Sequence, residues 1–250
     1  MMKRRISMIV CVWVASTVAY GQDKPSGDTN EAVEILKKVD AAAKAVKAVK
    51  YKATFKGTGA AESQVPSMEG TAVFTGLKGN APEKYRLDAT IKRPGSSDTQ
   101  KVTVISDGEE FALIDHTAKK AYVDIDPAVL GSTGQTLVRA IVVVEFVHAT
   151  PFSDELNGDK QEVTGNKKIG GVDCYEIDVT YAGGRGRSIW HFSKEDFLPR
   201  GRNVMFKTPD GKDGGRQYFV SDLEIDPKLD KDTFKINVPD GYETVDDFAP

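Results

Sequence analysis

The sequence predicts a mainly β protein of the α+β class, built on a single curved antiparallel sheet. Short runs of alternating apolar and polar residues recur along most of the chain, separated by turn sequences rich in Gly, Pro, Asn and Asp. Such runs at close spacing indicate an antiparallel meander with one apolar face. One stretch near the N-terminus has helical spacing, and one central stretch is almost wholly apolar. A sheet of about ten strands would curl to bury one face.

Composition agrees with one folded domain. The chain has 250 residues, of which 40% are hydrophobic and 28% are charged, and its formal net charge is −3. These fractions are typical of a globular protein and exclude wholesale disorder. The absence of a basic footprint argues against nucleic acid as a partner.

Residues 1–21 have the pattern of a secretory signal peptide. Basic residues at positions 3–5 precede an apolar run from Ile6 to Ala19, and small residues at Ala19 and Gly21 predict cleavage after Gly21. The run is short for a membrane span, which needs about 20 apolar residues, and an uncleaved anchor is the alternative. Residues 22–30 are then a flexible tether and residues 31–250 the folded domain. The mature protein is expected to be secreted, not membrane-spanning, and to keep Cys174 as a small buried packing residue.

The elements of the first half follow from spacing. Residues 31–49 are expected to form one amphipathic helix with a lysine-rich outer face. Alternation then places Tyr51, Ala53 and Phe55 on one side of a strand and lysines on the other. The same alternation continues through residues 84–92, 102–104, 111–113 and 121–125, which predicts further strands of the meander.

The meander is interrupted by the apolar segment Leu137–Val147. Its length and its glycine-containing start favour a buried helix, whereas its run of valines favours a strand. A second meander is predicted over residues 161–168, 172–181, 187–192, 200–207 and 216–225. Phe234, Ile236 and Val238 alternate again and are expected to form a last edge strand.

The sequence contains no pattern typical of catalysis or metal binding. His116, His148 and His191 stand without a second ligand at metal-site spacing, and no nucleophile elbow is present. The glycine-rich stretch 183–187 is expected to be a hairpin turn because it lacks the lysine and the following helix of a phosphate loop. We therefore predict no enzyme activity, no catalytic residue, no metal and no cofactor.

The order of motifs along the mature chain resembles the periplasmic lipoprotein carrier and sorting proteins (LolA/LolB-like). An alanine-rich helix leads into Val49–Phe55, and Gly70–Phe74 precedes Pro82–Arg86. Ser106–Phe111 then resembles a hairpin of that family, followed late in the chain by residues 190–192, 198–200, 229–234 and 238–242. No single motif is specific; their order across about two hundred residues carries the resemblance.

The resemblance implies an unclosed antiparallel β-barrel, with the N-terminal helix and a central apolar helix as a lid over its concave face. That face would hold acyl chains. Taken with the alternation, the expected ligand cavity is lined by Tyr51, Phe55, Phe74, Tyr85, Leu87, Ile91, Val104, Phe111, Leu113, Ile141 and Val144. Many carriers have an arginine just before the proline that corresponds to Pro82, where it helps to hold the lid; here that position is Ala81.

The function expected from the resemblance is carriage of acyl chains or lipidated proteins through the periplasm, for lipoprotein transport to the outer membrane. Partners would include transport components of the inner and outer membranes. The alternative is an envelope-stress sensor or protein-interaction domain with the same fold. A basic stripe that includes Lys44, Lys47 and Lys50 is either a solvated face or a docking surface for acidic headgroups or an acidic partner.

Overall fold

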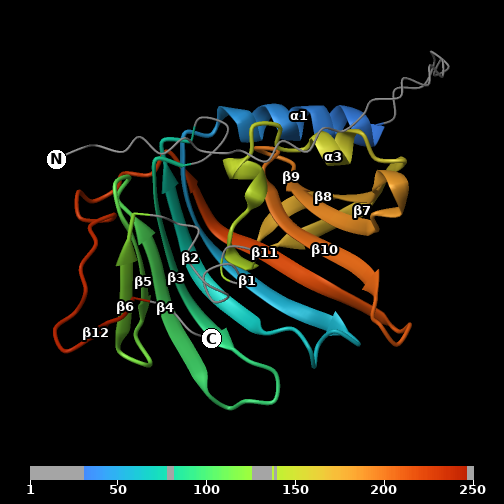
Figure 1. The fold of residues 1–250 in the computed structure, drawn as a ribbon. Coiled ribbons are helices and arrows are strands. Elements are labelled where there is room, and N and C mark those ends of the chain that lie inside the picture. Colours follow the sequence, from blue (N-terminus) through green and yellow to red (C-terminus); the bar gives the residue numbers. More distant parts are fainter. Residues whose placement is uncertain (1–30, 78–81, 126–136, 138–139, 247–250) are drawn as a thin grey trace, which may run out of the picture.

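The computed structural model describes residues 31–77, 82–125, 137 and 140–246, and the signal peptide and tether expected over residues 1–30 lie outside this part of the chain. The described strands form one twelve-stranded sheet in the order β12-β6-β5-β4-β3-β2-β1-β11-β10-β9-β8-β7. Its edge strands β12 and β7 do not pair with each other, so the sheet is curved but open (Figure 1). The predicted fold class, an unclosed β-barrel with helices, is confirmed.

Two antiparallel meanders make up the sheet. The first contains β1 (Ala48–Gly59), β2 (Ser67–Thr75), β3 (Lys84–Lys92), β4 (Thr99–Ser106), β5 (Phe111–Asp115) and β6 (Lys120–Asp124). The second contains β7 (Lys160–Ile169), β8 (Val172–Thr180), β9 (Arg187–Ser193), β10 (Pro199–Lys207) and β11 (Asp213–Ile225). The two meanders join where β1 pairs with β11, from Val49 opposite Ile225 to Gly59 opposite Gly214. The short strand β12 (Glu243–Thr244) adds to β6 in parallel.

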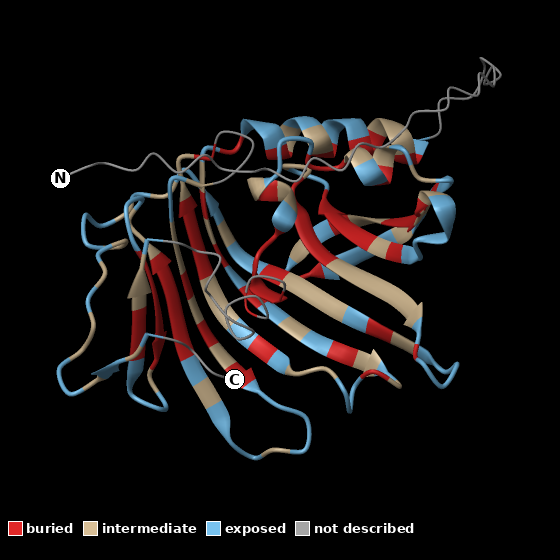
Figure 2. Cartoon of the chain, in the orientation of Figure 1, coloured by how far each residue is buried: buried red, intermediate tan, exposed pale blue. Residues whose placement is uncertain are grey.

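The inner face of the first meander is apolar because the predicted alternation keeps one register across all six strands. Cross-strand partners form a continuous buried row from β1 to β6, namely Tyr51, Ala72, Leu87, Val104, Leu113 and Tyr122. Side chains from the central segment pack onto this row and complete the largest core cluster. Figure 2 marks in red the buried stretches of these strands and of the central segment that lies within their curve.

The central apolar segment is not one continuous helix, which corrects the expectation from its length. Leu137, Ala140 and Ile141 are helical, Val142 and Val143 are not, and a 3-10 turn, η2 (Val144–Val147), follows. β-branched side chains restrict their own rotamers in a helix, which accounts for a break at the valines. The segment still occupies the inside of the sheet, as expected of a lid (Figure 1).

Helix α1 (Glu31–Ala45) covers the inner face of the second meander (Figure 1). It buries Ile35, Leu36 and Val39 against a cluster that includes Trp190 and Phe192. The helix ends four residues before the predicted boundary at residue 49, since the amide of Val46 turns back to the carbonyl of Ala43 at 3.3 Å and β1 begins at Ala48. The short helix α3 (Ser153–Leu156) lies beside α1, and a 3-10 turn, η3 (Ala182–Gly184), joins β8 to β9. Within the described ranges, no helix is both long and apolar enough to cross a membrane.

The C-terminal segment covers the outer face of β4–β6, and the last edge strand predicted at Phe234, Ile236 and Val238 is wrong. These residues are not in a strand; Ile236, Val238 and Tyr242 pack on a cluster of Ile105, Ala112, Ile114 and Ala121. Their alternation arises because one side of this segment packs against the sheet, although its backbone does not form the hydrogen bonds of a strand. The chain reaches the sheet edge only at β12.

Candidate functional site

The candidate site is a groove on the inner face, where the central segment meets the second meander. It has a volume of about 300 Å³, at the lower end of the range for small-molecule sites. Its walls come from η2 and the residues before it, and from β1, β9, β10 and β11. The lining residues are Phe55, Val142, Val143, Val144, Glu145, Trp190, Arg202, Val204, Arg216 and Tyr218.

Two tyrosines hold the break in the central segment. The carbonyl of Ile141 accepts hydrogen bonds from the Tyr51 hydroxyl at 3.1 Å and from the Tyr218 hydroxyl at 3.2 Å. The Tyr51 hydroxyl in turn accepts one from the amide of Val143 at 2.9 Å. Backbone groups freed by a helix break inside an apolar core need such partners. Burial raises the pKa of both tyrosines, so they stay neutral and able to donate.

A glycine in β2 makes room for the central segment. A Cβ at Gly70 would lie 2.8 Å from Cδ1 of Ile141 and would also meet the backbone of Asp88. The ring of Tyr51 contacts that of Phe146 with centroids 6.1 Å apart. The segment therefore fits the sheet closely at Gly70 and borders the groove at its valines.

Arg202 is the charged residue of an otherwise apolar cross-strand row. The row runs from Phe55 through Tyr218, Arg202 and Trp190 to Ile177. The guanidinium stacks on Trp190, 4.6 Å from the ring centroid, and lies 5.6 Å from that of Tyr181. Such cation–π contacts hold a positive charge in partly desolvated surroundings.

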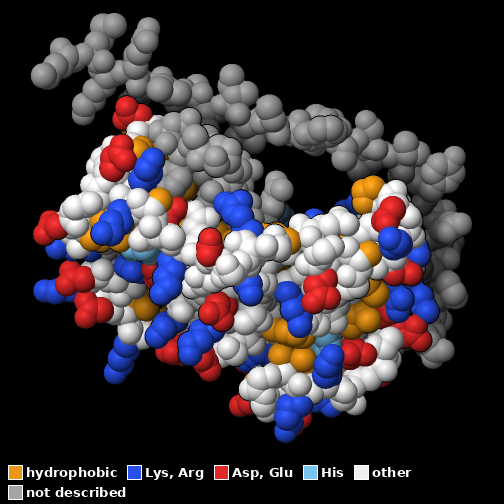
Figure 3. All heavy atoms as spheres, turned by 90° about the horizontal axis from the view of Figure 1, so that it is seen from below, with side chains coloured by type: hydrophobic (Ala, Val, Ile, Leu, Met, Phe, Trp, Pro, Cys, Tyr) orange, Lys and Arg blue, Asp and Glu red, His pale blue; other side chains and the backbone are white. Residues whose placement is uncertain are grey.

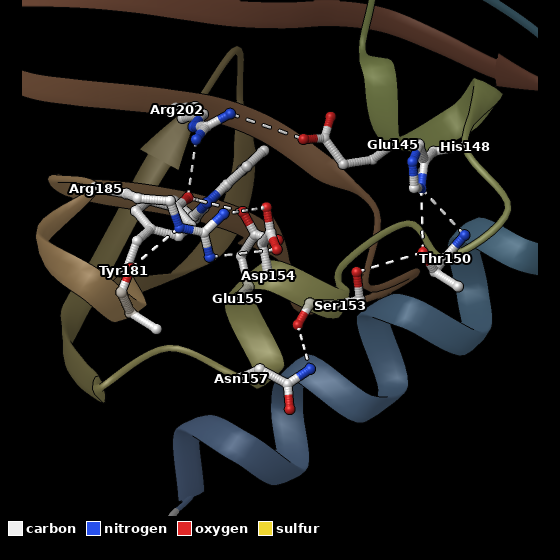
Figure 4. Close-up of polar contacts among 12 residues, drawn as sticks. Glu145, His148, Thr150, Ser153, Asp154, Glu155, Asn157, Tyr181, Arg185 and Arg202 are labelled. Atoms are coloured by element: carbon white, nitrogen blue, oxygen red, sulfur yellow. Dashed lines mark hydrogen bonds and ion pairs between the residues drawn. The ribbon is translucent and has the colours of Figure 1, made fainter. Parts of the chain in front are cut away.

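Glu145 is the carboxylate nearest to Arg202. The Arg202 Nη1 lies 3.8 Å from the Glu145 Oε1, an ion-pair distance that is too long for a hydrogen bond (Figure 4). Burial raises the pKa of Glu145 to about 7, and the nearby Arg202 opposes that shift. Glu145 is thus only partly ionised at neutral pH.

A second buried carboxylate is tied to the same arginine through a tyrosine. Arg202 Nη2 donates to the Tyr181 hydroxyl at 2.9 Å, which donates to Glu155 Oε1 at 2.7 Å (Figure 4). Trp190 Nε1 also donates to Tyr181 at 3.1 Å. Burial raises the pKa of Tyr181 to about 12, so the hydroxyl keeps its proton. The network fixes Arg202 through Tyr181 and Glu155, neither of which lines the groove.

The predicted cavity residues divide into a filled core and a groove. Most of them belong to the core cluster that the central segment completes, and Tyr85 packs against that cluster. The residues of this first set are Tyr51, Phe74, Tyr85, Leu87, Ile91, Val104, Phe111, Leu113 and Ile141. Phe55 and Val144 line the groove, and Val144 is 48% exposed at its rim. Whether any of them contacts a ligand stays a prediction.

Sequence reasoning missed the second-meander wall of the groove. Trp190, Arg202, Val204, Arg216 and Tyr218 come together only through the register of β9, β10 and β11. Alternation in residues 200–207 and 216–225 was a usable signal, since it places these side chains on the inner face. An arginine on an inner face is the feature that could have drawn attention to the site.

The lysines of the suggested docking surface are largely engaged with acidic neighbours. Lys44 pairs with Asp40 at 2.6 Å and Lys50 with Glu224 at 3.5 Å, while Lys47 is exposed. Seen from below, the surface intersperses basic and acidic side chains, with apolar side chains in small groups (Figure 3). A docking role for Lys44, Lys47 and Lys50 stays a prediction.

Other polar clusters have structural partners. His116 bridges Thr103 on β4 at 2.9 Å and Tyr242 of the C-terminal segment at 3.1 Å. His191 is fully buried and lies 3.2 Å from Glu176; burial lowers its pKa. Cys174 is buried, as expected. Among the described residues, no group of three or more His, Cys, Asp or Glu is arranged to hold a metal ion.

A larger depression of about 480 Å³ lies on the outer face of β1–β4. Polar and charged side chains such as Lys52, Asp88 and Lys101 line it, and strand backbone forms part of its floor. The smaller inner groove combines enclosure, aromatic walls and a fixed charge, which makes it the better candidate for an apolar ligand.

Comparison with known proteins places the chain in a family. A family model described as "Predicted periplasmic protein (DUF2092)" matches residues 32–246, and the chain belongs to that family. The family description agrees with the periplasmic location expected from the sequence. Among curated proteins, none matches the chain.

One similar solved structure shows the same fold at low sequence identity, and two others align more loosely. LprF from Mycobacterium bovis is 11% identical, with a TM-score of 0.52 over 85% of this chain and 97% of that chain. The lipoprotein LppX from Mycobacterium tuberculosis is 12% identical, with a TM-score of 0.44 over 83% and 97%. A LolA superfamily protein from Nitrosomonas europaea is 13% identical, with a TM-score of 0.33 over 82% and 97%. The likeness to LprF confirms the fold that the resemblance implied, and the family model agrees with the expectation of a periplasmic protein.

Proposed function

We propose that this periplasmic protein is a non-enzymatic carrier that binds acyl chains, free or attached to a lipidated protein, on the inner face of its sheet. The observation that carries the proposal is the pairing of an apolar inner face with a separate segment that occupies it. That segment is broken at its valines and borders an open groove of about 300 Å³. A chain entering the groove would extend onto the inner face as the segment moves away.

Binding in this scheme is apolar burial without a covalent step. Each Å² of apolar surface removed from water contributes about 25 cal/mol to binding. The closed form is the arrangement described above, in which the central segment occupies the inner face, and the ligand would replace the contacts that the segment makes there. The exposed Val144 at the groove rim marks where the segment is least buried. Donor and acceptor partners at the two membranes, as for a lipoprotein carrier, are part of the proposal.

The test fills the groove and leaves the sheet intact. Val204 points into the groove from β10, whereas its neighbour Met205 points to the opposite face and is similarly half-buried. Val204→Trp should weaken the binding of a fluorescent fatty acid by tenfold or more, and Met205→Trp should leave it unchanged. Equal binding by both variants would place the ligand elsewhere.

The result with the unmodified protein decides between the carrier and the alternative function. Native mass spectrometry of the protein purified from its own envelope without detergent should show a bound acylated species. A protein that is empty and also ignores fluorescent fatty acids would favour the sensor or interaction domain. In that case, charge reversal at Lys44 and Lys47 should abolish capture of a protein partner.

A further inference from the structure

The groove contains a fixed positive charge that an apolar ligand alone would not need. Arg202 lies on the inner face between Tyr218 and Trp190, with its side chain 30% exposed. Removing a guanidinium from water is unfavourable unless acceptors or a counter-charge replace the lost hydration. If the hydrogen-bond acceptors around Arg202 do not fully replace its hydration, the groove has room for an anionic ligand group beside it.

The hydrogen bonds of Arg202 leave one edge of the guanidinium available. Nε donates to the Ser188 hydroxyl at 3.2 Å, and Nη2 donates to the Tyr181 hydroxyl at 2.9 Å. Both acceptors are neutral. Nη1 faces Glu145, whose carboxylate lies 3.8 Å away (Figure 4). Stacking on Trp190 fixes the plane of the group, so Nη1 is held in place before any ligand arrives.

Glu145 is a weak counter-ion for this edge. It belongs to η2 on the central segment, whereas Arg202 belongs to the sheet. Movement of the segment would carry Glu145 away from Arg202. Burial also raises the pKa of Glu145 to about 7, so part of the population lacks the negative charge at neutral pH.

A second arginine lines the same groove. In the register of β10 and β11, Arg202 lies opposite Tyr218, and Val204 lies opposite Arg216. Arg216 is thus a diagonal neighbour of Arg202 on the inner face. Its guanidinium lies over Phe206, 5.4 Å from the ring centroid. Among the described residues, no carboxylate lies within ion-pair distance of Arg216.

We infer that the groove takes an anionic amphiphile, with a carboxylate or phosphate head bound between Arg202 and Arg216 and its acyl chain against the valines and aromatic residues of the wall. The head would take the place of Glu145 at Nη1. Planar guanidinium groups suit both kinds of head, through charge-assisted hydrogen bonds. The inference rests on the proposed function and specifies the ligand class.

The experiment compares amphiphiles that share one acyl chain and differ in the head. Laurate and dodecyl phosphate are the anionic probes, monolaurin the neutral one and dodecyltrimethylammonium the cationic one. Isothermal titration with the mature protein should give at least about tenfold tighter binding of the anions than of monolaurin, and the weakest binding for the cation. Acetate and inorganic phosphate serve as heads without a chain.

Variants locate the selectivity. Arg202→Gln and the more exposed Arg216→Gln should each lower the ratio of laurate affinity to monolaurin affinity. Arg185→Gln is the matched control, because Arg185 is an exposed arginine that pairs with Asp154 away from the groove. If Arg202→Gln fails to fold because Arg202 no longer stacks on Trp190, Arg216→Gln still tests the inference.

The outcomes separate this inference from the proposed function. Equal affinity for anionic and neutral amphiphiles would overturn the anion site and leave the carrier proposal standing. Selectivity that persists in both arginine variants would also overturn it. Tight, arginine-dependent binding of acetate or inorganic phosphate would show a site for free anions in place of an amphiphile. Failure of every probe with a chain would reject the carrier function itself.

Discussion

Replacement of Tyr51 by Phe should loosen the central segment and strengthen ligand binding at the same time. The hydroxyl accepts from the buried Val143 amide at 2.9 Å and donates to the Ile141 carbonyl at 3.1 Å. In Tyr51→Phe the Ile141 carbonyl keeps its bond from Tyr218, but the Val143 amide loses its partner. A buried donor left unpaired costs about 1–3 kcal/mol, which corresponds to roughly a 5- to 150-fold change in an equilibrium.

The stability of the closed arrangement and the affinity for ligand should move in opposite directions. Hydrogen exchange at the Val143 amide should accelerate by that factor, because the closed arrangement is less stable. Affinity for a fluorescent fatty acid should rise by up to the same factor. A ligand that binds only when the central segment has moved away from the inner face then spends less free energy on displacing it. An ordinary destabilising mutation would lower both stability and binding.

Tyr218→Phe is the matched control for this reasoning. It removes one of two donors to the Ile141 carbonyl and leaves the Val143 amide bonded, so the cost should be about 0.5–1.5 kcal/mol. Equal effects of the two variants would refute the assignment of the Val143 amide as the critical group. A fall in ligand affinity in Tyr51→Phe would show that the ligand binds without displacing the segment.

Further predictions concern pH, fit and packing. The folded-state pKa of Glu145 is about 7, above the usual 4.5, so the protein should lose stability as pH rises between these values, by about 3 kcal/mol in all. Urea unfolding of Glu145→Gln should lack that loss; an identical pH profile in both proteins would contradict it. Gly70→Ala should cost about 1–3 kcal/mol because its Cβ meets the central segment and β3, whereas Gly165→Ala, where a Cβ meets nothing within 4 Å, should be tolerated. Thermal unfolding compares the two, and an equal loss would argue against the close fit at Gly70. Phe152→Ala should cost about 3–5 kcal/mol, because the ring is fully buried and packs edge-on against Trp190; a loss below 1 kcal/mol would refute that packing role.

The strands were predictable because their periodicity is local. Tyr51, Ala53 and Phe55 alternate with lysines, and the structure places the two sets on opposite faces of β1. The same pattern was misleading at Phe234, Ile236 and Val238, where one-sided packing on the outer face produces alternation without a ladder. Alternation in the sequence shows which side chains are buried, but an irregular segment packed on a sheet can bury them as well as a strand can.

The groove could not be predicted because it depends on register between distant strands. Alternation could have placed Arg202 and Arg216 on the inner face, but only the pairing of β10 with β11 makes them neighbours. The break at Val142 and Val143 was equally hidden, since a valine-rich run is compatible with either helix or strand. Its position depends on Tyr51 and Tyr218, which are remote in the chain.

The join between the two meanders has a consequence for how the protein folds. β1 follows the first helix, whereas its partner β11 is the last long strand, so their ladder closes a loop that contains nearly the whole domain. Each meander consists of neighbours in the sequence and is able to form early, while the β1–β11 ladder is the slow, non-local step. In a chain that emerges N-terminus first, β1 keeps an unpaired edge until β11 has appeared. That interval is when the chain is most exposed to wrong strand pairing.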